Sequence, residues 1–296
     1  MRLNRFLAAA GLGSRRSCEE LILKGSVTLN GSVRRDLSTR VLPGDDVRVS
    51  GRKVHAFAPR TLLLNKPAGY VSTRSDRHAE RTIFDLLPSD LGHLFHVGRL
   101  DKESEGLLLL TNDGALSQEL LHPSRGVDKE YEVVLDKTFT ARDAAALKKG
   151  TWIEGSVARV ESVRQLGPNK IVVVLHQGLK RQIRIMLGQL GFRVQRLVRI
   201  RLGPLTLRGV KPGSFRELRA EDLAALRKAL AAPRPAKRKP IAAPKPKAIT
   251  FSRFTVIPAA PKRGSSEATG NASRNSPATK RPRKTSRTQA RLRKGT

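Results

Sequence analysis

A sharp change of composition near residue 230 divides the chain into a part that can fold around a hydrophobic core and a part that cannot. From 231 to 296 the sequence holds 18 Lys or Arg residues, nine of the chain's 17 prolines and a single acid, Glu267. Such a segment buries too little apolar surface to offset the conformational entropy lost on ordering. We therefore expect a folded body up to residue 230 and a disordered, basic, Pro-rich tail over 231–296.

The charge of the whole chain indicates a polyanionic partner. Lys and Arg number 58 against 25 Asp and Glu, which gives a net charge of +33. Nucleic acid is the first partner that such a charge suggests, and an anionic membrane surface is the second. The sequence holds no apolar run of about 18 residues that would span a membrane and no signal-peptide pattern. A single cysteine, Cys18, excludes an intramolecular disulfide and fits a reducing compartment, so we expect a cytoplasmic protein that does not bind membranes.

The first 54 residues are predicted to form two short helices followed by a small sheet. Apolar residues repeat with helical spacing between 3 and 10, and Ser14 is placed to cap a second helix. Alternating apolar residues around the turn-forming pair Asn30 and Gly31 then indicate a hairpin. Surface arginines of the two helices are open to two readings, a solvated helix face or a contact with RNA, and the charge of the chain favours RNA for Arg2, Arg5, Arg15 and Arg16.

The segment 61–230, which follows a predicted linker over 55–60, mixes short apolar runs with single helices. Runs such as 107–110 and 171–175 are typical of buried strands, and apolar residues over 183–190 repeat with helical spacing. Strands interrupted by single helices indicate an α+β fold with a mainly antiparallel sheet.

One polar loop is the candidate for chemistry. Residues 96–114 read as a glycine-bounded polar loop that leads into a buried strand, and Asp101 lies directly before that strand. Loop residues held by a rigid core element often carry function. From spacing alone, Asp101 is equally suited to cap a turn or to pair with Arg99.

Metal and cofactor chemistry is not expected. The six histidines are scattered without Cys or acidic residues at ligand spacing, so no metal site is predicted. The sequence also lacks a glycine-rich phosphate-binding loop and a dinucleotide-binding fingerprint. Cys18 lies on an apolar helical face and is expected to be a core residue.

Several motifs in register resemble one enzyme family. Gly98-Arg99-Leu100-Asp101, with Ser104 and the stretch 106–114, is similar to the catalytic motif of pseudouridine synthases of the RsuA, RluB and RluF type. Residues 1–54 resemble the S4 RNA-binding domain that precedes the catalytic domain in that family. Further matches lie, in the family's order, at 64–69, 122–125, 129–131, 177–184 and 191–192.

The resemblance implies a mechanism and assigns residues to it. Asp101 would be the nucleophile, attacking either C1′ of the sugar or C6 of the base of a uridine flipped out of its stack. Arg184 matches the basic partner of that aspartate. Tyr131 matches a tyrosine that stacks on the base and helps to remove the C5 proton. No cofactor is needed, because the isomerisation is redox-neutral, and further residues beside these motifs are expected to bind RNA: Arg99, Lys180 and Arg181.

The resemblance also implies the domains and the partner. We expect an S4 domain over 1–54 and a pseudouridine synthase domain over 61–230. The partner would be ribosomal RNA or a pre-ribosomal particle, with 23S RNA favoured and 16S possible, bound by a monomer. Leu179, Lys180 and Ile185 depart from common family residues, which leaves the target uridine open. Two alternatives remain: a non-catalytic RNA-binding or ribosome-assembly protein with the same fold, and a tRNA uridine isomerase.

Other basic residues of the second domain are candidates for phosphate contacts, which position RNA without reading its sequence. Each of them can equally be a plain solvated charge. They are Arg74, Arg77, Arg81, Arg193, Arg196, Arg199 and Arg201.

Overall fold

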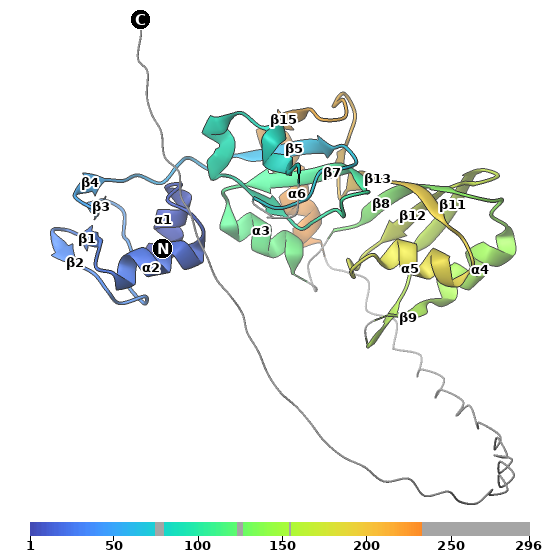
Figure 1. Cartoon of the computed structure of the whole chain (residues 1–296), viewed down its shortest axis with the longest axis horizontal. Coiled ribbons are helices and arrows are strands. Elements are labelled where there is room, and N and C mark those ends of the chain that lie inside the picture. The colour runs from blue at the N-terminus through green and yellow to red at the C-terminus, as the bar shows by residue number, and fades with distance from the viewer. Residues whose placement is uncertain (75–79, 123–126, 154, 233–296) are drawn as a thin grey trace, which may run out of the picture. The chain divides into compact units, whose positions relative to one another are not determined.

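The computed structural model describes residues 1–74, 80–122, 127–153 and 155–232 (Figure 1). The predicted tail lies outside the described residues except for its first two positions. Arg77 and most of the motif at 122–125 also lie outside them.

The N-terminal part forms the predicted two helices and a small sheet. Ser14 caps the second helix by accepting a 3.1 Å hydrogen bond from the backbone N–H of Ser17. Cys18 and Ile22 of that helix are fully buried, as their spacing predicts, and pack against Val27 and Val47 of the sheet. The antiparallel sheet has the order β2-β1-β3-β4. The elements are α1 (Leu3–Ala9), α2 (Arg15–Leu23), β1 (Val27–Leu29), β2 (Ser32–Val33), β3 (Val47–Val49) and β4 (Arg52–Lys53).

A larger sheet organises the second part, and it confirms the predicted mainly antiparallel α+β fold. Its strand order is β11-β12-β8-β13-β7-β5-β15, with β14 beside β13 and β6 beside β7. Among the described strands, β13 and β7 form the one parallel pair. The strands are β5 (Thr61–Lys66), β6 (Phe95–Val97), β7 (Glu105–Thr111), β8 (Lys129–Leu135), β11 (Ser162–Gly167), β12 (Lys170–Leu175), β13 (Val194–Leu202), β14 (Leu205–Thr206) and β15 (Phe215–Glu217).

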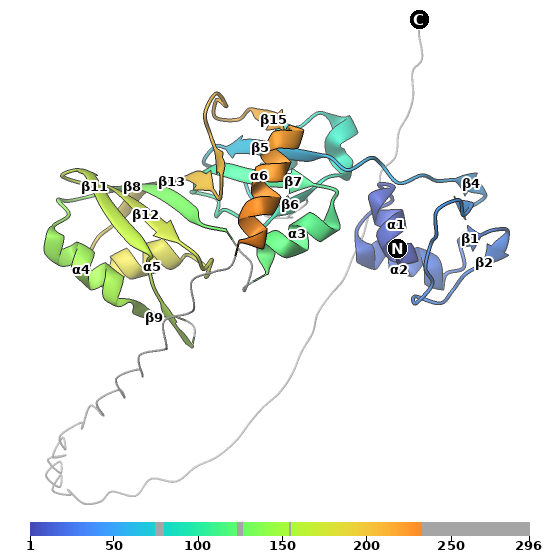
Figure 2. The same cartoon turned by 180° about the vertical axis from the view of Figure 1, so that it is seen from behind.

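Both faces of the sheet are covered, which explains the continuous apolar runs in the sequence. Leu108 and Leu110 of β7 face one core together with Met186 of α5, whereas Leu107 and Leu109 face a second core. A strand buried on both sides reads as an uninterrupted apolar run. Figure 2 shows α6 and α3 on the side of the second core. The helices are α3 (Gly114–Leu121), α4 (Ala141–Lys149), α5 (Gln182–Gln189) and α6 (Ala220–Ala231), with short 3-10 helices at Ile83–Leu86 and Ser89–His93.

Some elements carry too weak a pattern to be predicted. The helix α3, which follows β7, was not predicted, although Asp113 caps it by accepting from the N–H groups of Ala115 and Leu116. A small hairpin, β9 (Thr151–Ile153) and β10 (Ser156–Ala158), was also not predicted. None of the helices in the described ranges is both long and apolar enough to cross a membrane.

Candidate active site

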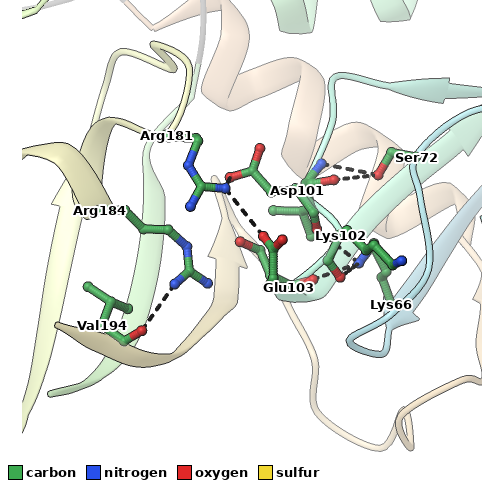
Figure 3. A network of polar contacts seen from close by, with 10 residues as sticks. Lys66, Ser72, Asp101, Lys102, Glu103, Arg181, Arg184 and Val194 are labelled. Carbon is green, nitrogen blue, oxygen red and sulfur yellow. Dashed lines mark hydrogen bonds and ion pairs between the residues drawn. The ribbon is translucent and has the colours of Figure 1, made fainter. Parts of the chain in front are cut away.

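Asp101 lies in a loop that is fixed at the residue before it. The loop leads into β7, and the Asp101 side chain keeps 35% of its surface exposed. Ser72 donates a 2.8 Å hydrogen bond to the carbonyl oxygen of Leu100 and accepts a 3.2 Å hydrogen bond from its N–H (Figure 3). Because both polar groups of Leu100 are held by one buried hydroxyl, Asp101 is presented from a defined backbone position.

Lys66 holds the same loop through hydrogen bonds to its backbone carbonyl oxygens. It ends β5, and its side chain is fully buried. Its ammonium donates to the carbonyl oxygens of Pro67 (3.1 Å), Asp101 (3.1 Å), Lys102 (3.3 Å) and Ser104 (2.7 Å). A buried cation whose donors are taken up by carbonyl oxygens ties the strand end to the loop.

Lys66 belongs to the motif at 64–69, and no role was predicted for it. Its burial lowers its pKa from 10.5 to about 8, against the opposing attraction of the carboxylates of Glu105, Asp101 and Glu103. The signal available in the sequence was a lysine two residues after the buried run 62–64. A cation at the end of such a run needs a polar partner.

The basic residue that pairs with Asp101 is Arg181. Its Nη1 atom lies 3.9 Å from Oδ2 of Asp101 and 3.3 Å from Oε2 of Glu103 (Figure 3). Arg181 precedes α5 with a φ of 51°, a left-handed conformation that is uncommon for a residue other than glycine. The sequence analysis had assigned Arg181 to RNA binding, so the structure adds a contact with Asp101 to that assignment.

Arg184, which the resemblance paired with Asp101, has a different partner. Its Nη1 donates to the carbonyl oxygen of Val194 at 3.1 Å, and Nε and Nη2 are buried without a hydrogen-bond partner among the described residues. Its guanidinium nevertheless faces the Asp101 loop beside Arg181 (Figure 3). Burial and then the repulsion of Arg181 lower its pKa, whereas the attraction of Glu103 and Asp101 raises it. Two nitrogens of this half-buried side chain are thus polar atoms without a hydrogen-bond partner among the described residues, which is uncommon in a folded protein.

Tyr131 lies on β8, and β13 separates β8 from β7, the strand that follows Asp101. It is 8% exposed and belongs to the same hydrophobic core as Leu100, which precedes Asp101, and Ile183 of α5. On β8 it pairs in register with Arg199 of β13, and Arg199 in turn pairs with Gly106 of β7. The strand β13 therefore pairs on one side with β8, which carries Tyr131, and on the other side with β7, which follows Asp101.

Arg199 is not the phosphate contact that the sequence suggested. It is 4% exposed, and its Nε donates a 2.6 Å hydrogen bond to the carbonyl oxygen of Leu107, directly after the parallel pairing of β13 with β7 ends. Its backbone lies so close to Gly106 that a Cβ there would lie 2.3 Å from the Arg199 carbonyl oxygen. The side chain of Arg199 thus adds a hydrogen bond between β13 and β7 at the point where their backbone pairing ends.

Other predicted phosphate contacts are also occupied within the chain. Arg196 pairs with both carboxylate oxygens of Glu105, at 2.9 and 2.8 Å. Arg201 donates to Glu130 at 2.5 Å. Arg74 donates to the carbonyl oxygens of Gly92 and Leu94. The sequence could not separate these from RNA-binding arginines, because their partners, two glutamates and two backbone carbonyl oxygens, lie far from them in the chain.

The RNA-binding candidates of the N-terminal part are exposed. Arg2 and Arg5 line an open concavity together with Met1 and Arg40, and the backbones of Arg2 and Arg40 form an isolated antiparallel bridge. Arg40 was missed by the sequence analysis because it is distant from the helices in the chain. The other predicted residues are also exposed at their positions: Arg15 and Arg16 in α2, and Arg99 and Lys180 in the catalytic part.

The site brings one carboxylate and two guanidinium groups to the same loop. Asp101 is partly exposed on a fixed loop, the guanidinium of Arg181 lies beside it, and Nε and Nη2 of the half-buried Arg184 have no hydrogen-bond partner among the described residues. This arrangement suits covalent catalysis on a substrate that carries negative charge. In the described part of the chain, no three His, Cys, Asp or Glu side chains are grouped so that they could hold a metal ion.

Comparisons with known proteins identify the family of the chain. The family model described as RNA pseudouridylate synthase matches residues 60–189, and the S4 domain model matches residues 1–47. An uncharacterized RNA pseudouridine synthase of Aquifex aeolicus (strain VF5) is 38% identical over 237 residues, which cover 78% of this chain and 95% of that relative. The dual-specificity RNA pseudouridine synthase RluF of Escherichia coli (strain K12) is 35% identical over 233 residues, 78% of this chain and 79% of RluF.

A crystal structure of a pseudouridylate synthase has the same fold, with a TM-score of 0.56 and 24% identity over 76% of this chain and 99% of that one. The chain therefore belongs to the RNA pseudouridylate synthase family, whose members isomerise uridine to pseudouridine in RNA, and it carries an S4 domain ahead of its catalytic part.

Proposed function

We propose that this chain converts a uridine of structured ribosomal RNA into pseudouridine, with 23S RNA as the favoured substrate and Asp101 as the nucleophile. The observation that carries the proposal is the presentation of Asp101. Its loop is held by Lys66 and Ser72, and its half-exposed carboxylate lies 3.9 Å from the guanidinium of Arg181. A carboxylate fixed at this point reaches a substrate without prior ordering of the loop.

In the proposed reaction the N1–C1′ bond breaks, the uracil turns, and a C5–C1′ bond forms. The C5 proton is lost and N1 gains a proton, so the isomerisation is redox-neutral. Asp101 would form a transient bond either to C1′ or to C6, and both routes use the same carboxylate. The target base must leave its stack to reach the site, and the site must then keep water from the broken bond.

Arg184 and Tyr131 have separate roles in this proposal. The unpartnered Nε and Nη2 of Arg184 would donate to an anionic oxygen of the substrate, such as a backbone phosphate next to the target. The ring of Tyr131 would stack on the turned base, and its hydroxyl would assist the removal of the C5 proton. Its place in the core beside Leu100 supports this role.

Binding of a large RNA would use both parts of the chain. The exposed Arg2, Arg5 and Arg40 of the S4 domain offer an unpaired basic surface, and phosphate contacts there would position the RNA. A non-catalytic RNA-binding protein would need this surface too. It would have no need of a carboxylate that Lys66 and Ser72 fix beside the guanidinium of Arg181, which favours the enzyme.

Release of tritium from RNA labelled at C5 of uridine tests the proposal, because the C5 proton leaves only when the new bond forms. The purified chain and the Asp101→Asn variant would be incubated with ribosomal RNA transcripts and, separately, with tRNA transcripts. We expect release from ribosomal RNA by the wild type alone. Release from tRNA instead would show that tRNA, and not ribosomal RNA, is the substrate. Release by Asp101→Asn would overturn the assignment of the nucleophile.

A further inference from the structure

An exposed tryptophan lies on the hairpin β9–β10. Trp152 is the chain's single tryptophan and is 58% exposed. Its neighbour Ile153 and the hairpin residue Ala158 are buried in the catalytic core, so the hairpin is anchored by one face and presents Trp152 on the other. A large aromatic ring left in water at an anchored position is a candidate contact surface.

The hairpin is tied to the element that faces Asp101. Gln182, the first residue of α5, donates a 3.1 Å hydrogen bond to the carbonyl oxygen of Arg159, directly after β10. The preceding residue is Arg181, whose guanidinium lies 3.9 Å from Asp101. Figure 1 shows β9 next to α5. The hairpin that carries Trp152 is therefore joined to the start of the helix that directly follows Arg181.

Basic residues precede and follow the hairpin in the sequence. Lys148 and Lys149, at the end of α4, are exposed, and the stem of Arg159 crosses the base of the hairpin against Gly150. None of these three cations has an ion-pair partner within the described residues. The nearby acid Glu161 lies 3.5 Å from His176.

We propose that Trp152 stacks on an unpaired base of the substrate RNA that borders the target uridine, with Lys148, Lys149 and Arg159 on the adjoining phosphates. The inference rests on the proposed function in one respect, that RNA occupies the Asp101 site. An aromatic platform beside cations is the arrangement by which proteins bind single-stranded nucleic acid. The cations favour RNA over a protein partner, and removal of one base from its stack leaves its neighbour free to stack on the indole.

The single tryptophan makes this contact directly measurable by fluorescence. The full chain would be titrated with a short single-stranded oligouridylate and with a fully paired RNA duplex of equal length at the same salt concentration. We expect quenching of the Trp152 emission by the single strand and little change with the duplex. Unchanged emission when the oligouridylate is bound, or equal quenching by the duplex, would overturn the proposal.

Variants separate stacking from charge and from folding. Trp152→Ala should weaken binding of the single strand by about 5- to 150-fold, the range of base–aromatic stacking, and Trp152→Phe should stay within about threefold of the wild type. Leu166→Ala removes another exposed apolar side chain, 45% exposed on β11, and should bind like the wild type. Binding by Trp152→Ala equal to that of Leu166→Ala would contradict stacking.

Failure of this inference is distinguishable from failure of the proposed function. If tritium is released normally while Trp152 emission does not respond, the enzyme assignment stands and the stacking contact is wrong. If emission responds and the binding loss in Trp152→Ala is found but no RNA is modified, the contact stands and the proposed reaction is wrong.

Discussion

The ammonium of Lys66 donates a 2.7 Å hydrogen bond to the carbonyl oxygen of Ser104, across the loop that presents Asp101. Lys66 also donates to the carbonyl oxygens of Asp101 and Lys102. The buried Lys66 side chain therefore holds the backbone from which the Asp101 side chain projects. The position of the proposed nucleophile therefore depends on Lys66, which is fully buried and out of reach of a substrate. Residues that hold a reactive group in place affect rate as strongly as those that touch substrate.

The burial of Lys66 predicts a pH dependence of stability. Its pKa is about 8 in the folded chain and 10.5 ordinarily, so between these values the unfolded chain holds a proton that the folded chain has lost. The free energy of unfolding should therefore rise with pH over this window. The gain is about 3 kcal/mol over the 2.5 pH units. Urea unfolding of the wild type and Lys66→Met at several pH values measures it as the difference between the two proteins.

The free energy of unfolding of the wild type minus that of Lys66→Met should grow between pH 8 and 10.5. Lys102→Met is the matched control, because it removes an exposed charge from the same loop, and it should show no such growth. A difference between wild type and Lys66→Met that shrinks as pH rises would mean that the four carbonyl oxygens stabilise the ammonium more than burial disfavours it.

The two arginines of the site should respond differently to substitution. The ion pair of Arg181 with Asp101 is exposed and long, and such pairs contribute at most about 1 kcal/mol. Arg181→Gln should therefore reduce the rate by no more than about fivefold. Arg184→Gln removes the buried donors that we assign to the substrate and should reduce it by about 100-fold or more. Single-turnover tritium release compares the variants, and the reverse order would contradict these roles.

Tyr131→Phe should separate the ring of Tyr131 from its hydroxyl. The ring is buried in the core and Phe fills the same space, so folding and RNA affinity should be kept. Loss of the hydroxyl should lower the rate of the chemical step by about 100-fold or more, as for other groups that transfer protons. The measurement is single-turnover kinetics at saturating enzyme. A wild-type rate in this variant would leave Tyr131 a stacking role alone.

The junction of β7 with β13 should tolerate no side chain at Gly106. A Cβ there would lie 2.3 Å from the Arg199 carbonyl oxygen, and its φ of 102° disfavours other residues. Gly106→Ala should lower the free energy of unfolding by about 3 kcal/mol or more. Gly114→Ala, at the start of α3 with open space around it, should be neutral or stabilising by up to about 1 kcal/mol. Equal unfolding midpoints for the two variants would show that the junction can relax.

Much of the fold could be predicted because its pattern is local. The Ser14 cap and the apolar runs of β7 and β12 follow from neighbouring residues alone. β13 could not be predicted, because its alternating arginines resemble a basic surface until their partners Glu105 and Glu130 are brought from other strands. The hairpin of Trp152 is short and depends on packing against the core.

The candidate site was predictable only in part, and for a physical reason. Spacing alone left Asp101 as a turn cap or as a partner of Arg99, and the family resemblance singled it out. Which arginine contacts Asp101 could not be read from the sequence, because Arg181 adopts a left-handed conformation and Arg184 bonds to Val194 on another element. The role of Lys66 required the loop carbonyls to be placed in space.

Pseudouridine mapping of total RNA by carbodiimide labelling and reverse transcription tests the central claim most directly. Cells that lack the gene would be compared with cells that express the wild type or Asp101→Asn. We predict that one stop in large-subunit ribosomal RNA is lost without the gene and restored by the wild type but not by Asp101→Asn. Restoration by Asp101→Asn would contradict Asp101 as the nucleophile, and an unchanged stop pattern, with no activity of the purified chain on any RNA, would contradict the enzyme.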